Sequence, residues 1–216
     1  MTADRSSQLL IDSGNSRVKW VWSSNGEVVS GDVLVNSEID THLRKIWGDN
    51  VPPAEVWLAN SGDIGREHQI NQIVEKLWGK RVRSVHSTDH FDGLSNGYYS
   101  PDQLGVDRWL GMIAAWHRIC GALCLVDCGT AITIDVIDDL GNHQGGVIMP
   151  GIGVSLKELA GKAPHLPLNQ GSFDDPLLGK STVEGLKAED SGSVVAVDRI
   201  VGKILRQNIG ASLLAT

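Results

Sequence analysis

The chain has 216 residues, of which 41% are hydrophobic and 21% charged, and its formal net charge is -7 at pH 7. This length suits one large or two small domains and excludes a mini-protein or a mostly disordered chain. The acidic balance argues against a nucleic acid as the main partner, because proteins bind phosphate polymers largely through Lys and Arg.

No stretch of the sequence has the composition of a signal peptide or a membrane span. The apolar run before Asp12 is short, whereas a membrane-spanning helix needs about 18 or more apolar residues. We therefore predict a cytosolic protein without a membrane segment. Cys120, Cys124 and Cys128 form no C-x-x-C pair and have no histidine beside them, which favours buried small side chains over disulfides or a zinc site.

Residues 9–85 predict the element order βββαβαβ. Alternating apolar residues indicate strands, Asn25-Gly26 indicates a hairpin turn, and apolar residues at helical intervals indicate two helices, with Ser37 as an N-cap and Gly79 as a C-cap. The expected strands are 9–11, 17–22, 27–35, 54–61 and 81–85, and the expected helices are 37–47 and 66–79.

The second half of the chain repeats the opening pattern. A glycine-rich loop at 91–107 and a helix from about Arg108 precede a second βββ unit at 122–149, in which His143 is expected at a solvated turn. Further helices are expected near 154–160 and 194–208, followed by a last strand at 211–216. The sequence thus predicts an α/β fold of two duplicated βββαβαβ domains, 1–115 and 116–216, with the second copy lacking its final helix and strand.

Each βββ unit begins with an aspartate-glycine turn, Asp12 to Ser16 in the first unit and Asp127 to Ala131 in the second. Such a turn can hold phosphate oxygens on its backbone N–H groups, and its carboxylate can hold a cation. An ordinary structural turn has the same composition. Two matched copies, expected to face each other across a cleft, favour phosphate binding, with Lys19 as an added positive charge.

Asp107 lies at the start of a predicted helix. It could be an N-cap, a position that aspartate fills well. It could also act as a general base that receives a hydroxyl proton during phosphoryl transfer, with Arg108 binding an anionic group of the substrate. The tryptophans, including Trp20, Trp22, Trp57 and Trp78, fall on apolar faces and are expected in the core.

Four motifs together resemble the type III pantothenate kinases, in order from residue 9 to about residue 185. They are "DSGNSRVK" (12–19), "NGY" with "PDQLGVDR" (96–108), "DCGTAITID" (127–135) and "GGVIMPG" (145–151). The family belongs to the superfamily of acetate and sugar kinases, chaperone ATPases and actin, and the resemblance implies an actin-like fold. It also implies transfer of the ATP γ-phosphate to the 4'-hydroxyl of pantothenate, the first step of coenzyme A synthesis.

The resemblance also implies site residues. It assigns ATP binding to Asp12, Ser13, Gly14, Asn15, Ser16, Arg17, Val18, Lys19 and Thr130. It assigns pantothenate binding to Tyr98, Gly105, Val106, Asp107, Arg108 and Thr182, with Asp107 as proton acceptor and Asp127 as a monovalent-cation ligand. The implied cofactors are Mg²⁺ with ATP and K⁺ or NH₄⁺, and the implied assembly is a homodimer that has no nucleic-acid or membrane partner.

Two alternatives remain open at this point. The short C-terminus, compared with the usual length of family members, would suit a non-catalytic or regulatory homologue that binds a ligand or a protein. A kinase of the same fold could also act on another small hydroxylated substrate, although both the "NGY" and "LGVDR" signatures are present.

Overall fold

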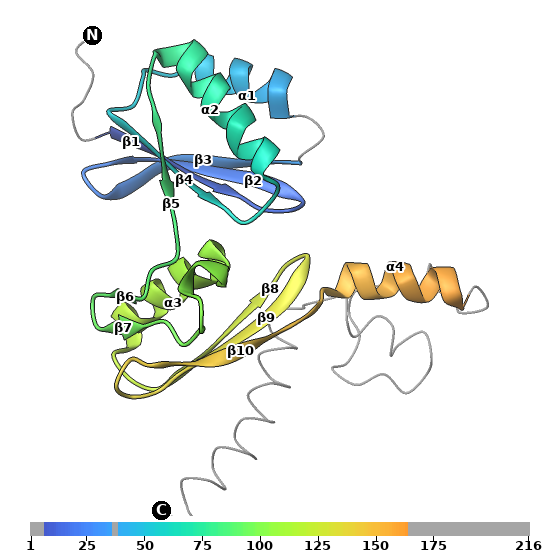
Figure 1. The fold of residues 1–216 in the computed structure, drawn as a ribbon. Coiled ribbons are helices and arrows are strands. Elements are labelled where there is room, and N and C mark those ends of the chain that lie inside the picture. The colour runs from blue at the N-terminus through green and yellow to red at the C-terminus, as the bar shows by residue number, and fades with distance from the viewer. Residues whose placement is uncertain (1–6, 36–38, 164–216) are drawn as a thin grey trace, which may run out of the picture. The chain divides into compact units, whose positions relative to one another are not determined.

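The structure, a computed structural model, describes residues 7–35 and 39–163 (Figure 1). Its strands are β1 (Ser7–Ser13), β2 (Arg17–Ser24), β3 (Glu27–Val35), β4 (Glu55–Asn60), β5 (Val82–Val85), β6 (His90–Phe91), β7 (Leu94–Ser95), β8 (Leu123–Cys128), β9 (Ala131–Ile137) and β10 (His143–Pro150). Its helices are α1 (Ile39–Gly48), α2 (Ile64–Trp78), a 3-10 helix at Pro101–Gln103, α3 (Val106–Ile119) and α4 (Ile152–Lys162). Ser37 and the elements expected after residue 163 lie outside the described residues.

The first sheet has five strands in the order β3-β2-β1-β4-β5. Antiparallel pairing joins β1 to β2 and β2 to β3, whereas β4 and β5 run parallel to β1. The predicted order βββαβαβ is confirmed over this region. Parallel pairing requires crossover connections, and α1 and α2 supply them.

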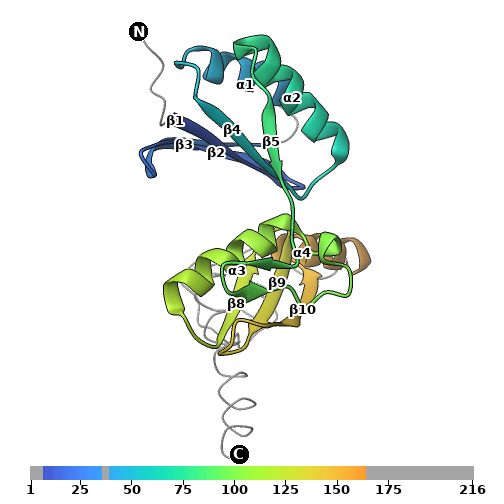
Figure 2. The same ribbon diagram turned by 60° about the vertical axis from the view of Figure 1, so that its left-hand side comes forward.

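Helices α1 and α2 cover one face of this sheet, as both ribbon views show (Figures 1 and 2). The core between the two layers includes Leu9 and Trp20 from the sheet and Trp47 from α1. The Trp47 ring stacks on Trp78 and meets Trp20 edge-on. Trp22 and Trp78 are partly buried against this core, and Trp57 is half-buried beneath the guanidinium of Arg83. The periodic apolar residues of strands and helices thus meet in one layer of packing.

Helix α2 has a defined cap at each end. At its N-terminus, Asp63 accepts a hydrogen bond from the N–H of Gly65, and the helix therefore begins at Ile64, earlier than expected. At its C-terminus, Gly79 adopts φ 63° and donates its N–H to the carbonyl of Glu75. The predicted glycine C-cap is confirmed, because a left-handed residue at this position suits glycine.

The loop expected over residues 91–107 contains a short hairpin, and the expectation was wrong at this point. β6 and β7 pair across Asp92 and Gly93, whose φ angles of 45° and 83° are both positive. This backbone is that of a tight hairpin turn, for which Asp-Gly is a favoured sequence.

The second sheet has the order β10-β9-β8. The turn from β9 to β10 is organised by Asp138, whose carboxylate accepts hydrogen bonds from the N–H groups of Leu140 and Asn142 and from the side chains of Asn142 and Gln144. These bonds, those of Asn142 above all, lower the pKa of Asp138. The expected turn at Leu140-Gly141 is confirmed, with Gly141 at φ 84°.

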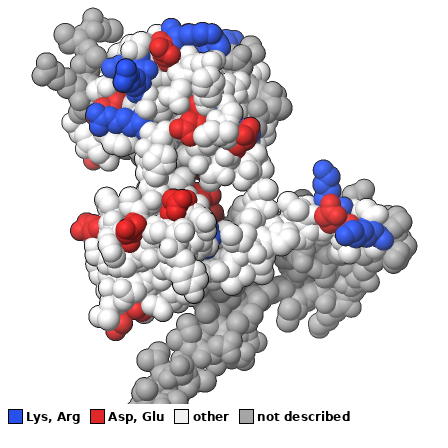
Figure 3. Space-filling model, viewed as in Figure 1, with Lys and Arg blue, Asp and Glu red and all other residues white. Residues whose placement is uncertain are grey.

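The chain divides into two compact units. The described residues of the first unit fall within Met1–Leu123 and Ile137–Gly145, and those of the second within Cys124–Val136 and Gly146–Thr216. On the face shown in Figure 3, basic and acidic side chains are mixed over β1–β5 with α1 and α2. Within the described ranges, no helix is both long and apolar enough to cross a membrane.

Candidate active site

The first aspartate-glycine turn joins β1 to β2. Asp12 lies opposite Lys19 in the strand pairing, and the Lys19 ammonium contacts the Asp12 carboxylate at 3.2 Å. The N–H of Gly14 donates to the carbonyl of Arg17 at 2.9 Å and closes the turn. The Lys19 side chain is largely exposed and that of Asp12 partly exposed, so a bound anion can reach the ammonium group of Lys19.

Ser13 ends β1 beneath this turn. Its side chain is fully buried, and its hydroxyl is one of two buried side-chain polar atoms without a hydrogen-bond partner among the described residues. Such a group costs free energy unless water or a ligand satisfies it. Residues 12–19 of the predicted ATP site thus form one continuous segment around this turn, with an unsatisfied hydroxyl under it, whereas Thr130 lies in the second turn, between β8 and β9.

Tyr98 and Arg108 form the centre of the predicted pantothenate site. The guanidinium of Arg108 donates a hydrogen bond to the Tyr98 hydroxyl at 2.8 Å, and its central carbon lies 5.6 Å from the ring centroid. Arg108 is only 7% exposed. The Tyr98 hydroxyl thus helps to orient the guanidinium of Arg108, a group whose planar fork of donors suits an anionic substrate group.

The "NGY" motif has a structural reason at each position. The side-chain oxygen of Asn96 accepts the N–H of Tyr98, and its amide donates to the carbonyls of Thr88 and Pro101. A Cβ at Gly97 would collide with the carbonyl of His143. Asn96 therefore shapes the loop, Gly97 permits its close approach to β10, and Tyr98 meets Arg108.

The sequence-based expectation for His143 was wrong. We expected a solvated turn, but His143 is the first residue of β10 and is only 3% exposed. Its ring stacks on that of Tyr98, with centroids 5.9 Å apart and planes 13° apart, and its Nδ1 accepts a hydrogen bond from Gly97. No local pattern indicated this role, because the contacts of His143 lie far away in the sequence.

Asp107 lies in the first turn of α3 and is not its N-cap. Gly105 occupies the N-cap position, with no side-chain cap, and Val106 begins the helix. The N-cap interpretation was therefore wrong. The Asp107 carboxylate is exposed and accepts the N–H of Arg108 at 2.8 Å, so its second oxygen points to solvent or to a ligand.

The second aspartate-glycine turn lies between β8 and β9. Asp127, Gly129 and Thr130 are exposed there. Gly151 donates its N–H to the Thr130 carbonyl, and a Cβ at Gly151 would lie 2.6 Å from that oxygen. The glycine of "MPG" therefore packs directly on the second turn.

The cysteines are not the uniformly buried residues that we predicted. Cys120 is exposed, and Cys124 and Cys128 are half-buried. Burial, and then the charge of Asp127, raises the pKa of the Cys128 thiol. Burial, and then the charge of Asp135, raises the pKa of the Cys124 thiol in the same way, and a raised pKa disfavours the reactive thiolate at these two positions.

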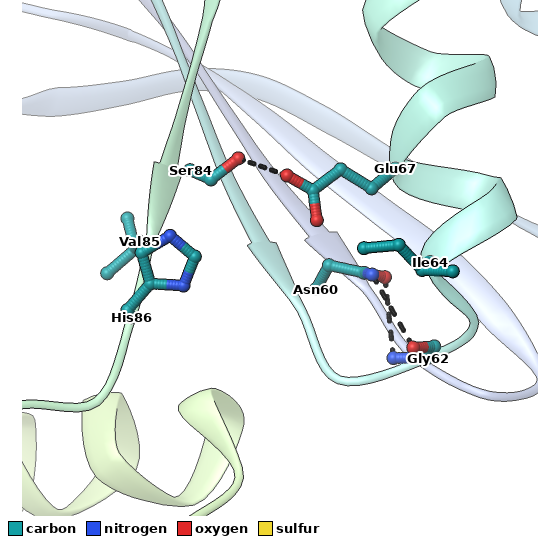
Figure 4. Close-up of a pocket in the computed structure, with 7 residues that line it drawn as sticks. All are labelled: Asn60, Gly62, Ile64, Glu67, Ser84, Val85 and His86. Carbon is teal, nitrogen blue, oxygen red and sulfur yellow. Dashed lines mark hydrogen bonds between the residues drawn. The ribbon is translucent and has the colours of Figure 1, made fainter. Parts of the chain in front are cut away.

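A pocket of about 240 Å³ lies at the carboxyl ends of β4 and β5 (Figure 4). Its lining residues are Asn60, Gly62, Ile64, Glu67, Ser84, Val85 and His86. The Ser84 hydroxyl donates to the Glu67 carboxylate across it. It is smaller than most pockets for drug-sized ligands, roughly 300–1,000 Å³, and it does not contain the predicted site residues.

The described residues hold no group of three or more His, Cys, Asp or Glu side chains placed to bind a metal ion. Each turn instead offers one carboxylate, Asp12 or Asp127. This donor set suits Mg²⁺ bound mainly through substrate phosphates and water. Thr182 lies outside the described residues.

The sequence profile of the family described as type III pantothenate kinase matches residues 8–206. The chain belongs to this family. A type III pantothenate kinase of Nitrosococcus oceani is 32% identical over 200 residues, which are 89% of this chain and 75% of that protein. The type III pantothenate kinase of Halorhodospira halophila is 32% identical over 212 residues, which are 92% of this chain and 81% of that protein.

Two solved structures share the fold of this type III pantothenate kinase family member. One is a Campylobacter jejuni protein assigned to the Baf family of transcriptional activators, with a TM-score of 0.55, 23% identity, and coverage of 90% of this chain and 78% of that chain. The other is a Sinorhizobium meliloti protein classed as a 2-dehydro-3-deoxygalactonokinase, with a TM-score of 0.55, 12% identity, and coverage of 92% and 81%.

Proposed function

We propose that this chain transfers the γ-phosphate of ATP to the 4'-hydroxyl of pantothenate, the first step of coenzyme A synthesis. Membership of the type III pantothenate kinase family carries this conclusion. The half-buried Tyr98 with the buried Arg108, next to the exposed Asp107, supports it, because pantothenate has a carboxylate to bind and a 4'-hydroxyl to activate. No observation favours a non-catalytic homologue.

In this proposal, the turn from Asp12 to Lys19 holds the ATP phosphates on its backbone N–H groups. Lys19 and Arg17 contribute positive charge, and Ser13, Gly14, Asn15, Ser16 and Val18 complete the turn. Thr130 contributes a hydroxyl from the second turn. The transition state of phosphoryl transfer is loose, so positioning of the phosphates makes a large contribution to catalysis.

The acceptor side uses the residues around the start of α3. Arg108 pairs with the carboxylate of pantothenate, Tyr98 holds Arg108, and the backbone of Gly105 and Val106 lines the site, with Thr182 as a further contact. Asp107 orients the 4'-hydroxyl and receives its proton as the phosphoryl group arrives. An exposed aspartate suffices for this, because the loose transition state depends more on orientation than on base strength.

Cations complete the proposal. Mg²⁺ arrives with ATP and offsets the charge of the phosphates, and a monovalent cation, K⁺ or NH₄⁺, lies at Asp127. We further propose that the two βββ units are duplicated actin-like halves, each with its own phosphate turn, and that the enzyme is a cytosolic homodimer. Two phosphate turns of the same design suit this arrangement.

The test is ADP release from ATP in the presence of Mg²⁺ and K⁺, with and without pantothenate, for the wild type and Asp107→Asn. We expect pantothenate-dependent turnover and a drop in kcat of about 100- to 10,000-fold in the variant. Asp102→Asn is the matched control, since Asp102 is an exposed aspartate of the nearby 3-10 helix. An ADP release rate that is the same with and without pantothenate, or full activity in Asp107→Asn, would contradict the proposal.

A further inference from the structure

The segment that follows β4 lies directly against the first phosphate turn. The N–H of Ser61 donates to the carbonyl of Ser13 at 3.0 Å, and the Asn15 side chain donates to the carbonyl of Ser61 at 3.5 Å. The guanidinium of Arg66 donates to the carbonyl of Gly14. Three successive residues of the turn are thus bonded to one segment, although about fifty positions of sequence separate them.

Gly62 shows how closely the two segments approach. A Cβ at this position would lie 3.0 Å from the Gly14 carbonyl oxygen and 3.1 Å from the Arg66 guanidinium. The side chain of Asn60 folds over Gly62 and bonds to both its N–H and its carbonyl, as Figure 4 shows. Bonds within the segment itself therefore hold Gly62 in place, in addition to the contacts of the segment with the turn.

Arg66 occupies an unfavourable place for a cation. It lies in the first turn of α2, three residues after the Asp63 cap, where the positive end of the helix dipole repels a positive charge. Helix stability therefore does not account for an arginine at this position. The hydrogen bond from Arg66 to Gly14 does account for it. A residue that departs from a local preference often has a functional reason.

The carbonyl that Arg66 holds belongs to the peptide between Gly14 and Asn15. In a trans peptide, the C=O and N–H groups point in opposite directions. Fixing the oxygen towards α2 therefore directs the Asn15 N–H away from α2. An N–H group that is already oriented binds an anion more tightly than one that must reorient, because no conformational entropy is lost on binding.

We propose that Arg66 is a positioning residue for ATP, which holds the Gly14–Asn15 peptide of the first phosphate turn in its phosphate-binding orientation. This inference rests on the proposed function, in which the turn binds ATP. Arg66 acts through the backbone of the turn, and its positive charge adds to the attraction for the triphosphate.

The test compares KM for ATP and KM for pantothenate in the wild type, Arg66→Met and Arg66→Lys. Losing a charged hydrogen bond should raise KM for ATP about 10-fold in Arg66→Met, with KM for pantothenate unchanged. Arg66→Lys keeps the charge and should recover part of the loss. Gly62→Ala, which crowds both Gly14 and Arg66, should raise KM for ATP in the same way and serves if Arg66→Met does not fold.

Arg83→Met is the matched control. Arg83 belongs to the same sheet layer, pairs with Glu55 at 3.2 Å and covers Trp57, so its loss affects stability without touching the turn. The proposal is overturned if KM for ATP stays unchanged in both Arg66→Met and Gly62→Ala. It is also overturned if both KM values rise together in every variant, Arg83→Met included, because that pattern indicates general destabilisation.

Lys19→Ala separates this inference from the proposed function. If the wild type shows no pantothenate-dependent turnover, or Lys19→Ala leaves KM for ATP unchanged, the assignment of the turn to ATP is wrong. If Lys19→Ala raises KM for ATP and Arg66→Met does not, the turn binds ATP and only the role of Arg66 is wrong.

Discussion

The imidazole of His143 lies flat against the ring of Tyr98, with the ring planes 13° apart. The same imidazole accepts the N–H of Gly97, and the Tyr98 hydroxyl accepts a hydrogen bond from Arg108. A residue of the β9–β10 hairpin therefore supports Tyr98 directly and Arg108 through it, and we assign both side chains to the binding of pantothenate.

His143→Ala should raise KM for pantothenate about 10-fold and leave KM for ATP unchanged, because an aromatic pair contributes about 0.5–1.5 kcal/mol beyond its buried area. Steady-state kinetics with each substrate varied in turn measures both constants. His143→Phe keeps the stacked ring and should lose less. His117→Ala removes an exposed imidazole that lies 3.2 Å from the Asp92 carboxylate and is the control. A rise in KM for ATP alone would show that the stack does not serve the acceptor site.

Gly151→Ala should destabilise the protein by about 1–3 kcal/mol and lower its activity, because the added methyl group would meet the backbone of the second turn. Urea unfolding and ADP release measure the two effects. Gly153→Ala is the matched control: the same methyl group would meet no atom within 4 Å, and alanine favours the α4 helix. Equal effects of the two substitutions would contradict the importance of the close contact at Gly151.

Asp138→Ala should lower the urea midpoint at neutral pH. The pKa of this carboxyl is lowered from its ordinary 3.8 by its hydrogen bonds to Asn142 and its neighbours. A group with a lowered folded-state pKa stabilises the protein above its unfolded pKa, and this contribution is lost as the pH falls through the folded pKa. The difference between wild type and variant should therefore shrink below about pH 3.8.

Urea midpoints of the wild type and Asp138→Ala at pH 7 and at about pH 3 measure this dependence. Asp139→Ala, which removes an exposed aspartate of the same turn, controls for the loss of one negative charge. A constant difference between wild type and Asp138→Ala at both pH values would mean that ionisation of the carboxyl contributes nothing.

Asp127→Asn should raise the K⁺ concentration for half-maximal activity about 10-fold, since cation affinity depends on the charge of the ligands. ADP release is measured against KCl, with choline chloride added to keep the ionic strength constant. Asp139→Asn controls for a general loss of negative charge. Wild-type activity that does not depend on K⁺ would contradict the proposed role of Asp127. Separately, chelation of Mg²⁺ should abolish turnover in the wild type and in every variant.

Much of the fold could be predicted because it depends on neighbours in the chain. The period of apolar residues in β1, β2 and α2 and the glycine cap at Gly79 are local properties, and each is confirmed. The β6–β7 hairpin was missed although Asp92-Gly93 is a local hairpin signal. The start of α3 was predicted two residues too late, at Arg108 instead of Val106, because aspartate suits both a cap and a first helical turn.

The sequence by itself determined the elements of the first sheet and its two helices, the two aspartate-glycine turns and the family. Only the tertiary structure decided that His143 supports Tyr98 and that Arg66 holds the carbonyl of Gly14. Both contacts join residues more than forty positions apart. Periodicity and capping report on the nearest few residues, whereas burial and long-range hydrogen bonds arise only when the chain brings distant segments together.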